Sequence, residues 1–457
     1  MTYDSANSST VLDPALREEL GELLAIPSVS SEQSHASDVR AAGSWICSYL
    51  RRAGGTAELV DWEGQPLAIG EIPASTAPEE APTVLVYGHF DVQSPEPLDE
   101  WDSPPFEAAV RDGWLYGRGT ADDKGQLYLL LRAAAELAAE RALPVNVRFC
   151  CDGEEETGGH SIVDFLGIDT RPADACVIFD TAMPAQGVPA FVVTTRGLAF
   201  FRFRVRAGDR DLHSGVYGGA ALNALHVLTE SLEAIVPHYG RLREPLRAGV
   251  VPPSAAEVAD WEALPPAAAA LDEAGARPAD SAAAEEFYLR TWAEPSLDLH
   301  GVVAGSLAQK TIVPAVAEAV FSMRLVPDQQ VQVVAQEVER LLREAAPSGA
   351  RVELDLLAAT PPATMAPDAP AIELGLAAFE RALGVRPRLV RSGGSLPIVA
   401  ALQQRGVPTI VTGFDVPGGN IHAPNERLLV EHIPLGIAAA RELFVALRDL
   451  SATRPAL

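Results

Sequence analysis

Five short clusters of acidic residues and histidines follow apolar runs along this 457-residue chain, and their side chains are of the kinds that bind divalent metals. The clusters are HFD (89–91), DD (122–123), EEE (154–156), FD (179–180) and IHAPNE (421–426). Imidazole and carboxylate groups are common ligands of zinc and similar metals. Together they could hold two metal ions that share a bridging carboxylate, each ion keeping a position for water. Paired metals of this kind activate water and polarise a carbonyl, which indicates hydrolysis.

The elements around the clusters predict that they meet at one place. Four clusters come after apolar runs of strand length, and the fifth stands at the start of a helical pattern, residues 125–143. Alternation of strands and helices with unbroken apolar strands predicts a parallel sheet covered on both faces. Open α/β sheets build their sites at the carboxyl ends of such strands, so we expect the clusters at one edge of the sheet. The four runs are 83–88, 145–151, 175–179 and 408–414.

Taken singly, these residues also have ordinary structural interpretations. An isolated His89 is well explained as a surface histidine, and EEE as a solvated patch. The stretch GRGTADDKG (117–125) matches neither a dinucleotide fingerprint nor a Walker loop, and two adjacent acids would repel phosphate. They suit a cation, with Asp122 as the ligand and Asp123 as a helix-capping or supporting neighbour. The order and joint placement of the clusters favour the metal centre.

The run DGEEETGG (152–159) predicts a division of labour between neighbouring glutamates. It directly follows the strand 145–151, and we expect it to be extended. Adjacent side chains of an extended segment point to opposite sides, so one of Glu155 and Glu156 can bind a metal while the other handles a proton. Like charges this close raise one carboxyl pKa, which suits a general base near neutrality.

The sequence changes character near residue 196 and returns to the α/β pattern near residue 370. Apolar and charged residues alternate in 200–207 and 316–326, and less cleanly in 351–357, with helical patterns at 219–235 and 329–345. This predicts a small α+β domain with one solvent-exposed sheet face. Its stretch rich in Ala, Pro and acids is expected to be a surface insertion of short helices. The expected domains and insertion are a catalytic domain of 1–196 and 359–457, an inserted domain of 197–358, and the surface stretch 250–287.

Composition narrows the possible partners and the compartment. With 35 basic and 62 acidic residues, the formal charge of −27 argues against nucleic acid and anionic lipid surfaces as partners. No apolar run approaches the length of a membrane span, and the N-terminus MTYDSANSST lacks the pattern of a secretory signal. The four cysteines form no C-x-x-C pair, and their small number in a long chain predicts a reducing, cytoplasmic compartment. They are Cys47, Cys150, Cys151 and Cys176. Cys150 and Cys151 lie in an apolar run and are expected to be core thiols.

Eight segments, in order along nearly the whole chain, resemble the M20 family of co-catalytic metallopeptidases, especially its dipeptidase branch of carnosinase and cytosolic non-specific dipeptidase type. The resemblance implies a zinc-peptidase-like α/β catalytic domain with a mostly parallel central sheet. It also implies an inserted α+β, ferredoxin-like domain that serves as lid and dimerisation domain. One departure is an aspartate, Asp152, where the family usually has glutamate. The segments are GHFDV (88–92), YGRGTADDKG (116–125), DGEEETGG (152–159), IFD (178–180), DLHSGVYGG (211–219), FSMRLVPDQ (321–329), GGSLP (393–397) and NIHAPNE (420–426).

The resemblance implies which residues would bind metal. His89 and Asp180 would hold one ion, Glu156 and His422 the other, and Asp122 would bridge them, followed by a cis peptide. The implied cofactors are two divalent ions per subunit. Zinc is the expected metal, with manganese or cobalt as alternatives, because this ligand set suits all three.

The resemblance implies the remaining roles as well. Glu155 would be the general base and then the acid, and Asp91 would orient the adjacent metal-binding histidine. His213 would reach across a homodimer to stabilise the oxyanion in the partner's site. Arg324 and Ser395 would hold the terminal carboxylate of the substrate.

The predicted function is therefore metal-dependent hydrolysis of dipeptides, or of short peptides from the carboxyl end. An N-acyl-amino-acid deacylase of the same family would share the metal chemistry and differ only in its substrate pockets. A non-catalytic protein that binds peptides or metals is a further alternative, although the complete ligand set together with Glu155 argues against it. The missing fingerprint argues against an NAD-dependent enzyme.

Overall fold

The computed structural model describes residues 12–453 except 265, 267, 269–270, 272–274 and 306–309. The N-terminal stretch MTYDSANSST and part of the predicted insertion 250–287 lie outside the described residues. By its internal contacts the chain divides into two compact units. The first takes the chain up to Val193, Met365–Val390 and the part from Ala401 onward; the second takes Thr194–Thr364 and Arg391–Ala400.

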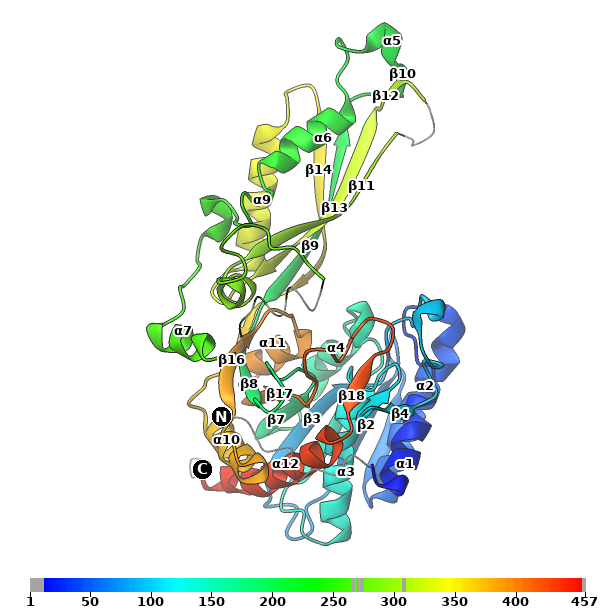
Figure 1. The fold of residues 1–457 in the computed structure, drawn as a ribbon, viewed down its shortest axis with the longest axis vertical. Coiled ribbons are helices and arrows are strands. Elements are labelled where there is room, and N and C mark those ends of the chain that lie inside the picture. Colours follow the sequence, from blue (N-terminus) through cyan, green and yellow to red (C-terminus); the bar gives the residue numbers. More distant parts are fainter. Residues whose placement is uncertain are drawn as a thin grey trace. The chain divides into compact units, whose positions relative to one another are not determined.

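The first unit is built on a nine-stranded sheet (Figure 1) with the order β1-β2-β6-β3-β7-β17-β8-β15, and β16 also pairs with β8. The neighbouring strands β6, β3, β7 and β17 run parallel. Pairs toward both edges of the sheet are antiparallel. The strands are β1 (Thr56–Val60), β2 (Leu67–Ile72), β3 (Thr83–His89), β6 (Asn146–Asp152), β7 (Ala175–Phe179), β8 (Ala190–Thr195), β15 (Ala363–Thr364), β16 (Arg388–Ser392) and β17 (Thr409–Thr412).

The four parallel strands are the apolar runs identified in the sequence, and they are buried along nearly their whole length. Such strands need cover on both faces, and long apolar helices supply it. Helix α3 packs against β2, β3 and β7, whereas α2 packs on β1 and β2. The helices are α1 (Pro14–Leu24), α2 (Ala36–Arg52), α3 (Lys124–Ala139), α4 (Ser161–Ile168), α10 (Pro370–Leu383), α11 (Pro397–Gln404) and α12 (His432–Leu447). The predicted α/β fold is confirmed, with a mixed sheet whose centre is parallel.

A small antiparallel sheet of order β18-β5-β4 also belongs to this unit. Its strands are β4 (Ala109–Arg111), β5 (Trp114–Tyr116) and β18 (Arg427–Leu429). Arg427 on β18 pairs with Tyr116 on β5, residues more than 300 positions apart. This pairing brings the chain after His422 alongside the loop that begins at Gly117.

The second unit has its own four-stranded antiparallel sheet, of order β11-β13-β9-β14, and its own core. In chain order it reads strand, helix, strand, strand, helix, strand, which with this strand order is the ferredoxin-like arrangement. Helices α6 and α9 pack against its strands. The elements are β9 (Gly197–Arg206), β10 (Leu212–His213), α5 (Ser214–Tyr217), α6 (Ala224–Glu233), α7 (Ala255–Glu262), β11 (Ser296–Ala304), β12 (Ile312–Val313), β13 (Val316–Leu325), α9 (Val331–Ala345) and β14 (Arg351–Thr360).

The alternation that predicted this domain is visible in the burial of its strands. Along β9 every second residue is buried, and the buried set includes Phe201, Phe203 and Val205. Helix α6 starts later than the predicted stretch 219–235. The side chain of Asn223 accepts hydrogen bonds from the backbone N–H groups of Leu225 and His226, and this cap fixes the helix start.

All four cysteines are buried free thiols, as the sequence predicted for Cys150 and Cys151. Burial raises the pKa of Cys150 to about 12, so this thiol is protonated at neutral pH. Among the described residues, no helix is both long and apolar enough to cross a membrane.

Candidate metal centre

The parallel strands bring the acidic clusters to one edge of the sheet. His89 is the last residue of β3, and it stands opposite Asp152, the last residue of β6. Asp180 directly follows β7, where its backbone N–H donates to the carbonyl of Thr412 at the end of β17. These four neighbouring strands therefore end close together, and the side chains of His89 and Asp180 converge there.

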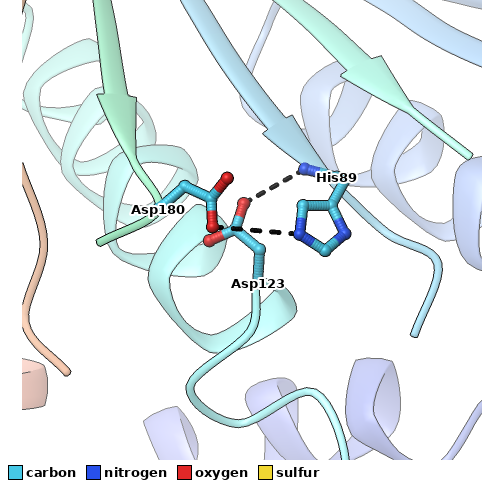
Figure 2. Close-up of side chains that lie close together, drawn as sticks. All are labelled: His89, Asp123 and Asp180. Carbon is cyan, nitrogen blue, oxygen red and sulfur yellow. Dashed lines mark hydrogen bonds and ion pairs between the residues drawn. The ribbon is translucent and has the colours of Figure 1, made fainter. Parts of the chain in front are cut away.

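Asp123, at the N-terminal end of α3, lies in this convergence with His89 and Asp180 (Figure 2). Oδ2 of Asp123 accepts the backbone N–H of His89 at 3.0 Å, and Oδ1 of Asp180 lies 3.9 Å from Nε2 of His89. Potential ligand atoms of the three side chains lie within 4.8 Å of one another. Oδ1 of Asp123 is buried and has no hydrogen-bond partner among the described residues. Asp123 thus supports the backbone of His89 and does not cap its helix with its side chain.

Asp122 lies between the two histidines and turns one oxygen toward each. Its Oδ1 is 2.9 Å from Nε2 of His89, and its Oδ2 is 3.0 Å from Nε2 of His422. The same nitrogen of His422 is 3.1 Å from Oε2 of Glu156. The peptide bond between Asp122 and Asp123 is cis, as the resemblance implied. A carboxylate that turns one oxygen toward each of two histidines could serve as a ligand to two ions.

The electrostatics of the cluster favour cations at this position. Hydrogen bonds to Asp122 and Glu156 raise the pKa of His422 to about 10, so the site stabilises positive charge. Burial, reinforced by the charge of Asp122, raises the pKa of Asp180 well above its ordinary value. Buried carboxylates this close together cannot all ionise without compensating positive charge. The residues present therefore fit a pair of divalent ions held by imidazole and carboxylate groups.

Asp91 is a buried anchor for two parts of the site. Its Oδ1 lies 3.4 Å from Nδ1 of His89, on the ring edge that faces away from Asp122. Its two oxygens also accept the backbone N–H groups of Glu155 at 3.2 Å and Glu156 at 3.1 Å. Ser30, which the sequence did not single out, donates its hydroxyl to Asp91 at 2.6 Å.

These hydrogen bonds correct one expectation from the sequence. Residues Glu155–Thr157 form a short 3₁₀ turn and not an extended segment. Because Asp91 accepts both N–H groups, the backbone at Glu155 and Glu156 must curl around one carboxylate. The two glutamates still differ in their partners: Oε2 of Glu156 receives the amide of Gln93 at 3.1 Å and the imidazole of His422.

Glu155 has the properties of a proton carrier. Among the described residues, no hydrogen bond to its carboxylate is found. Burial, together with the charges of Glu156, Asp122 and Asp91 and against the opposing charge of His89, raises its pKa to about 7. A carboxyl group that titrates near neutrality is suited to accept and return a proton.

Glu426 is the main residue whose role the sequence did not reveal. Its fully buried carboxylate accepts the guanidinium of Arg118 at 2.7 Å. It also accepts the backbone N–H groups of Gly119, Ala121 and Asp122 at 3.0, 2.9 and 3.1 Å. The only sequence signal was its place as the last acid of IHAPNE. Its partners lie 304–308 positions earlier, so only the fold could show that Glu426 fixes the loop that presents Asp122.

The other candidate residues lie in the second unit. Nη1 of Arg324 donates to Oγ of Ser395 at 2.9 Å, so the structure brings this pair together. His213 is exposed on β10, and its Nδ1 accepts the backbone N–H of Gly215 at 3.0 Å. The neutral ring therefore carries its proton on Nε2, which is available as a donor.

Comparisons with known proteins show the family of this chain. The sequence profile of peptidase family M20/M25/M40 matches residues 85–446, and the chain belongs to this family. It is 29% identical to the cysteinylglycine-S-conjugate dipeptidase of Corynebacterium striatum over 96% of this chain and 98% of that protein. It is 28% identical to the human Beta-Ala-His dipeptidase over 76% of this chain and 71% of that protein.

Solved structures agree on the fold. The M20 family metallo-carboxypeptidase Sso-CP2 of Sulfolobus solfataricus superimposes with a TM-score of 0.84 at 23% identity, covering 96% of this chain and all of that one. The predicted family and its fold are thereby confirmed. The relatives named above are dipeptidases, as the predicted branch of the family requires.

Proposed function

We propose that this protein is a two-metal dipeptidase that hydrolyses the peptide bond of dipeptides or short peptides. The observation that carries the proposal is the position of Asp122, with one oxygen toward His89 and the other toward His422. A further buried acid, Asp180, lies 3.9 Å from Nε2 of His89, which supports a cation at this place.

In this proposal each ion takes one histidine and one acid besides the bridge. His89 and Asp180 would hold one ion, Glu156 and His422 would hold the other, and Asp122 would contribute to both. Bound ions of this kind lower the pKa of water and polarise the carbonyl that is attacked. Zinc is the metal we expect, and manganese or cobalt would fit the same ligands.

Glu155 moves the proton. Its carboxylate takes a proton from the attacking water and later returns it to the nitrogen of the leaving amine. Its pKa of about 7 in the metal-free protein supports both steps, because neither protonation state is strongly disfavoured near neutral pH. Asp91 acts as a positioning residue, since it holds the backbone of the turn that carries Glu155.

The second unit supplies substrate contacts in this proposal. The guanidinium of Arg324 and the hydroxyl of Ser395 bind the terminal carboxylate. His213 donates Nε2–H to the developing oxyanion in the site of a second copy of the chain, so the working form is a homodimer. We further propose a cytoplasmic location, which suits four free buried thiols.

The relatives support a dipeptide as substrate. The proteins similar to this chain over most of its length are named for cysteinylglycine conjugates and for β-Ala-His, which are both dipeptides. We therefore propose free dipeptides before longer peptides.

The experiment that tests this function is hydrolysis by metal-stripped protein to which zinc, manganese or cobalt is returned. The substrates are a panel of dipeptides and a matched panel of N-acetyl amino acids. Metal-dependent cleavage of dipeptides is the expected result and would identify the working metal. Cleavage of N-acetyl amino acids alone would assign the protein to the deacylases, and no cleavage of either with metal bound would refute an enzymatic role.

A further inference from the structure

Two guanidinium groups of the second unit meet at the loop 393–395. Arg196 immediately precedes β9, and Arg324 near the end of β13 is paired with Leu198 in the adjacent strand. Nε of Arg196 donates to the carbonyl of Gly393 at 2.9 Å, and Nη1 of Arg324 donates to Oγ of Ser395 at 2.9 Å. The backbone N–H of Arg196 also donates to the carbonyl of Gly394 at 3.0 Å. Both cations are therefore fixed against one short loop, Arg196 at Gly393 and Gly394 and Arg324 at Ser395.

Every acceptor of these two guanidinium groups is neutral. Besides the loop, Nη1 of Arg196 reaches the backbone carbonyl of Glu294 at 3.3 Å and the hydroxyl of Ser296 at 3.4 Å. Among the described residues neither arginine forms an ion pair with a carboxylate. Burial lowers the pKa of both guanidinium groups, and the charge of Asp298, which acts only at longer range, opposes this shift in part.

This lack of compensation sets the pair apart from other partly buried arginines of the unit. Arg247, Arg290 and Arg391 each contact a carboxylate at 2.8 Å or less. Arg196 is only 8% exposed, and burial together with the charge of Arg324 lowers its pKa to about 10. Buried charges are normally paired, because desolvation of an unpaired ion is costly. Two adjacent unpaired cations therefore indicate a site that an anion from outside completes.

Arg196 also has one guanidinium nitrogen that remains available as a hydrogen-bond donor. Its Nε and Nη1 hold the loop and its surroundings, while Nη2 has no hydrogen bond to a described residue. The matching acceptor for a guanidinium edge is a carboxylate, which accepts charge-assisted hydrogen bonds that are about twice as strong as neutral ones. An uncharged amide in the same place would compensate neither of the two positive charges.

We propose that Arg196 and Arg324 together form a two-guanidinium carboxylate site, in which Arg196 determines the preference for substrates that end in a free carboxylate. The inference rests on the proposed function for its substrate, a dipeptide, and goes beyond it by assigning specificity to a residue outside the Arg324–Ser395 pair. A neutral side chain at position 196 should weaken binding of the carboxylate and leave binding of the corresponding amide nearly unchanged.

The test compares alanyl-alanine with alanyl-alaninamide as ligands. Binding is measured by calorimetry on metal-loaded protein that carries Glu155→Gln to prevent turnover, and kcat/KM is measured with Glu155 intact. The variants are Arg196→Gln and Arg196→Lys. Arg202→Gln is the matched control, because Arg202 lies on β9 in an exposed pair with Asp355 and loses the same charge.

With Arg196→Gln we expect alanyl-alanine to bind about 10- to 100-fold more weakly, as the loss of a charged hydrogen bond predicts. The amide should change by less than about twofold on the same scale, and Arg196→Lys should restore part of the difference. Arg202→Gln should resemble the parent. Equal weakening of both ligands, or no change for alanyl-alanine, would overturn the site.

Two further outcomes separate this inference from the proposed function. Arg196-dependent binding of alanyl-alanine without hydrolysis of any dipeptide would support the site and refute the dipeptidase. Hydrolysis of dipeptides with a preference for the free carboxylate that is unchanged in Arg196→Gln would support the dipeptidase and refute the site. If Arg196→Gln does not fold, Arg324→Gln and Arg196→Lys decide: both must reduce the preference for alanyl-alanine over its amide, and an unchanged preference would refute the site.

Discussion

At the scale of single residues, the candidate centre depends on carboxylates that are held apart by different partners. Asp91 faces the backbone of the turn at 155–157, whereas Asp122 faces two imidazoles. Glu156 is bound by Gln93 and His422, and Glu155 is left without a hydrogen bond among the described residues. Acids of the same type thus meet different surroundings, and burial raises the pKa of Glu155 to about 7.

The first prediction concerns Glu155. Replacement by Gln preserves shape and removes the proton acceptor, so turnover should fall by about 10²–10⁴-fold or more. Metal binding should persist, because Glu155 is outside the proposed ligand set. The measurements are kcat with a dipeptide and metal content per chain. Full activity in the Gln variant would remove Glu155 from the mechanism, and lost metal would make it a ligand.

A second prediction concerns Asp415, which lies after β17 and is 6% exposed. Burial raises its pKa from 3.8 to about 7. Between these values the unfolded chain is ionised and the folded protein is not, so stability from neutral Asp415 is lost as pH rises toward 7. Asp415→Asn cannot ionise, and its advantage in stability over the parent should grow between pH 4 and 7 to at most about 4 kcal/mol.

Thermal unfolding of metal-free protein at pH 5 and pH 8 measures this effect. The Asn variant should gain more over the parent at pH 8 than at pH 5. Asp449→Asn, at an exposed position, serves as the control and should show no such trend. A difference between parent and Asp415→Asn that does not depend on pH would contradict the buried, neutral carboxyl.

At the scale of elements, the site depends on the loop between β5 and α3. Glu426 accepts three of the loop's backbone N–H groups together with the guanidinium of Arg118, and the adjacent strand β18 pairs with β5. A fully buried carboxylate with four donors is strongly fixed. The strand ends supply His89 and Asp180, whereas the hydrogen bonds of Glu426, which lies about 300 residues later in the chain, fix the position of Asp122.

Glu426→Gln therefore should weaken metal binding without touching a ligand. The substitution leaves the buried Arg118 without a counter-charge, and loss of one partner of a buried pair costs about 3–5 kcal/mol of stability. Misplacement of a metal ligand by a lost supporting contact typically costs 10–100-fold in affinity, and we expect about that loss.

Calorimetric titration of the metal-free protein with zinc measures the affinity, and thermal unfolding measures the stability. Glu442→Gln is the control, since Glu442 forms an exposed pair with Arg381. An unchanged zinc affinity in Glu426→Gln would show that the loop holds its position without this carboxylate.

At the scale of the whole molecule, the proposed function is divided between two units with separate cores. The first carries the candidate metal ligands and Glu155, and the second carries Arg196, Arg324 and His213. Neither unit alone holds the full set of groups that the proposed reaction uses. Catalysis should therefore require both, and in the proposed dimer the second unit of one copy serves the first unit of another.

The last prediction tests this exchange. His213→Ala should lower kcat by about 10²–10³-fold, as removal of an oxyanion donor does. Mixing it with the Glu155→Gln protein under conditions that exchange subunits should restore part of the activity, because one hybrid site would have both residues intact. Absence of rescue, with hybrid dimers verified by mass, would show that His213 does not act in trans.

The sequence by itself determined the parts whose signals are local. Unbroken apolar runs predicted β3, β6, β7 and β17, because strands that are buried on both faces carry apolar residues throughout. Alternation of apolar and charged residues predicted β9 and β13, because strands that are buried on one face are apolar at every second position. The clusters at the ends of the parallel strands followed from the same rule.

Only the tertiary structure decided how these parts work together. It showed that Asp91 accepts the backbone N–H groups of the turn at 155–157 and that Asp122 turns one oxygen toward each histidine. It also showed that Glu426 fixes a loop some 300 positions earlier in the chain by hydrogen bonds. It also brought Arg196 beside Arg324 without a counter-ion. The physical reason is the same in each case: hydrogen bonds and charge compensation are settled between residues distant in sequence, and local pattern carries no record of which partner each group will meet.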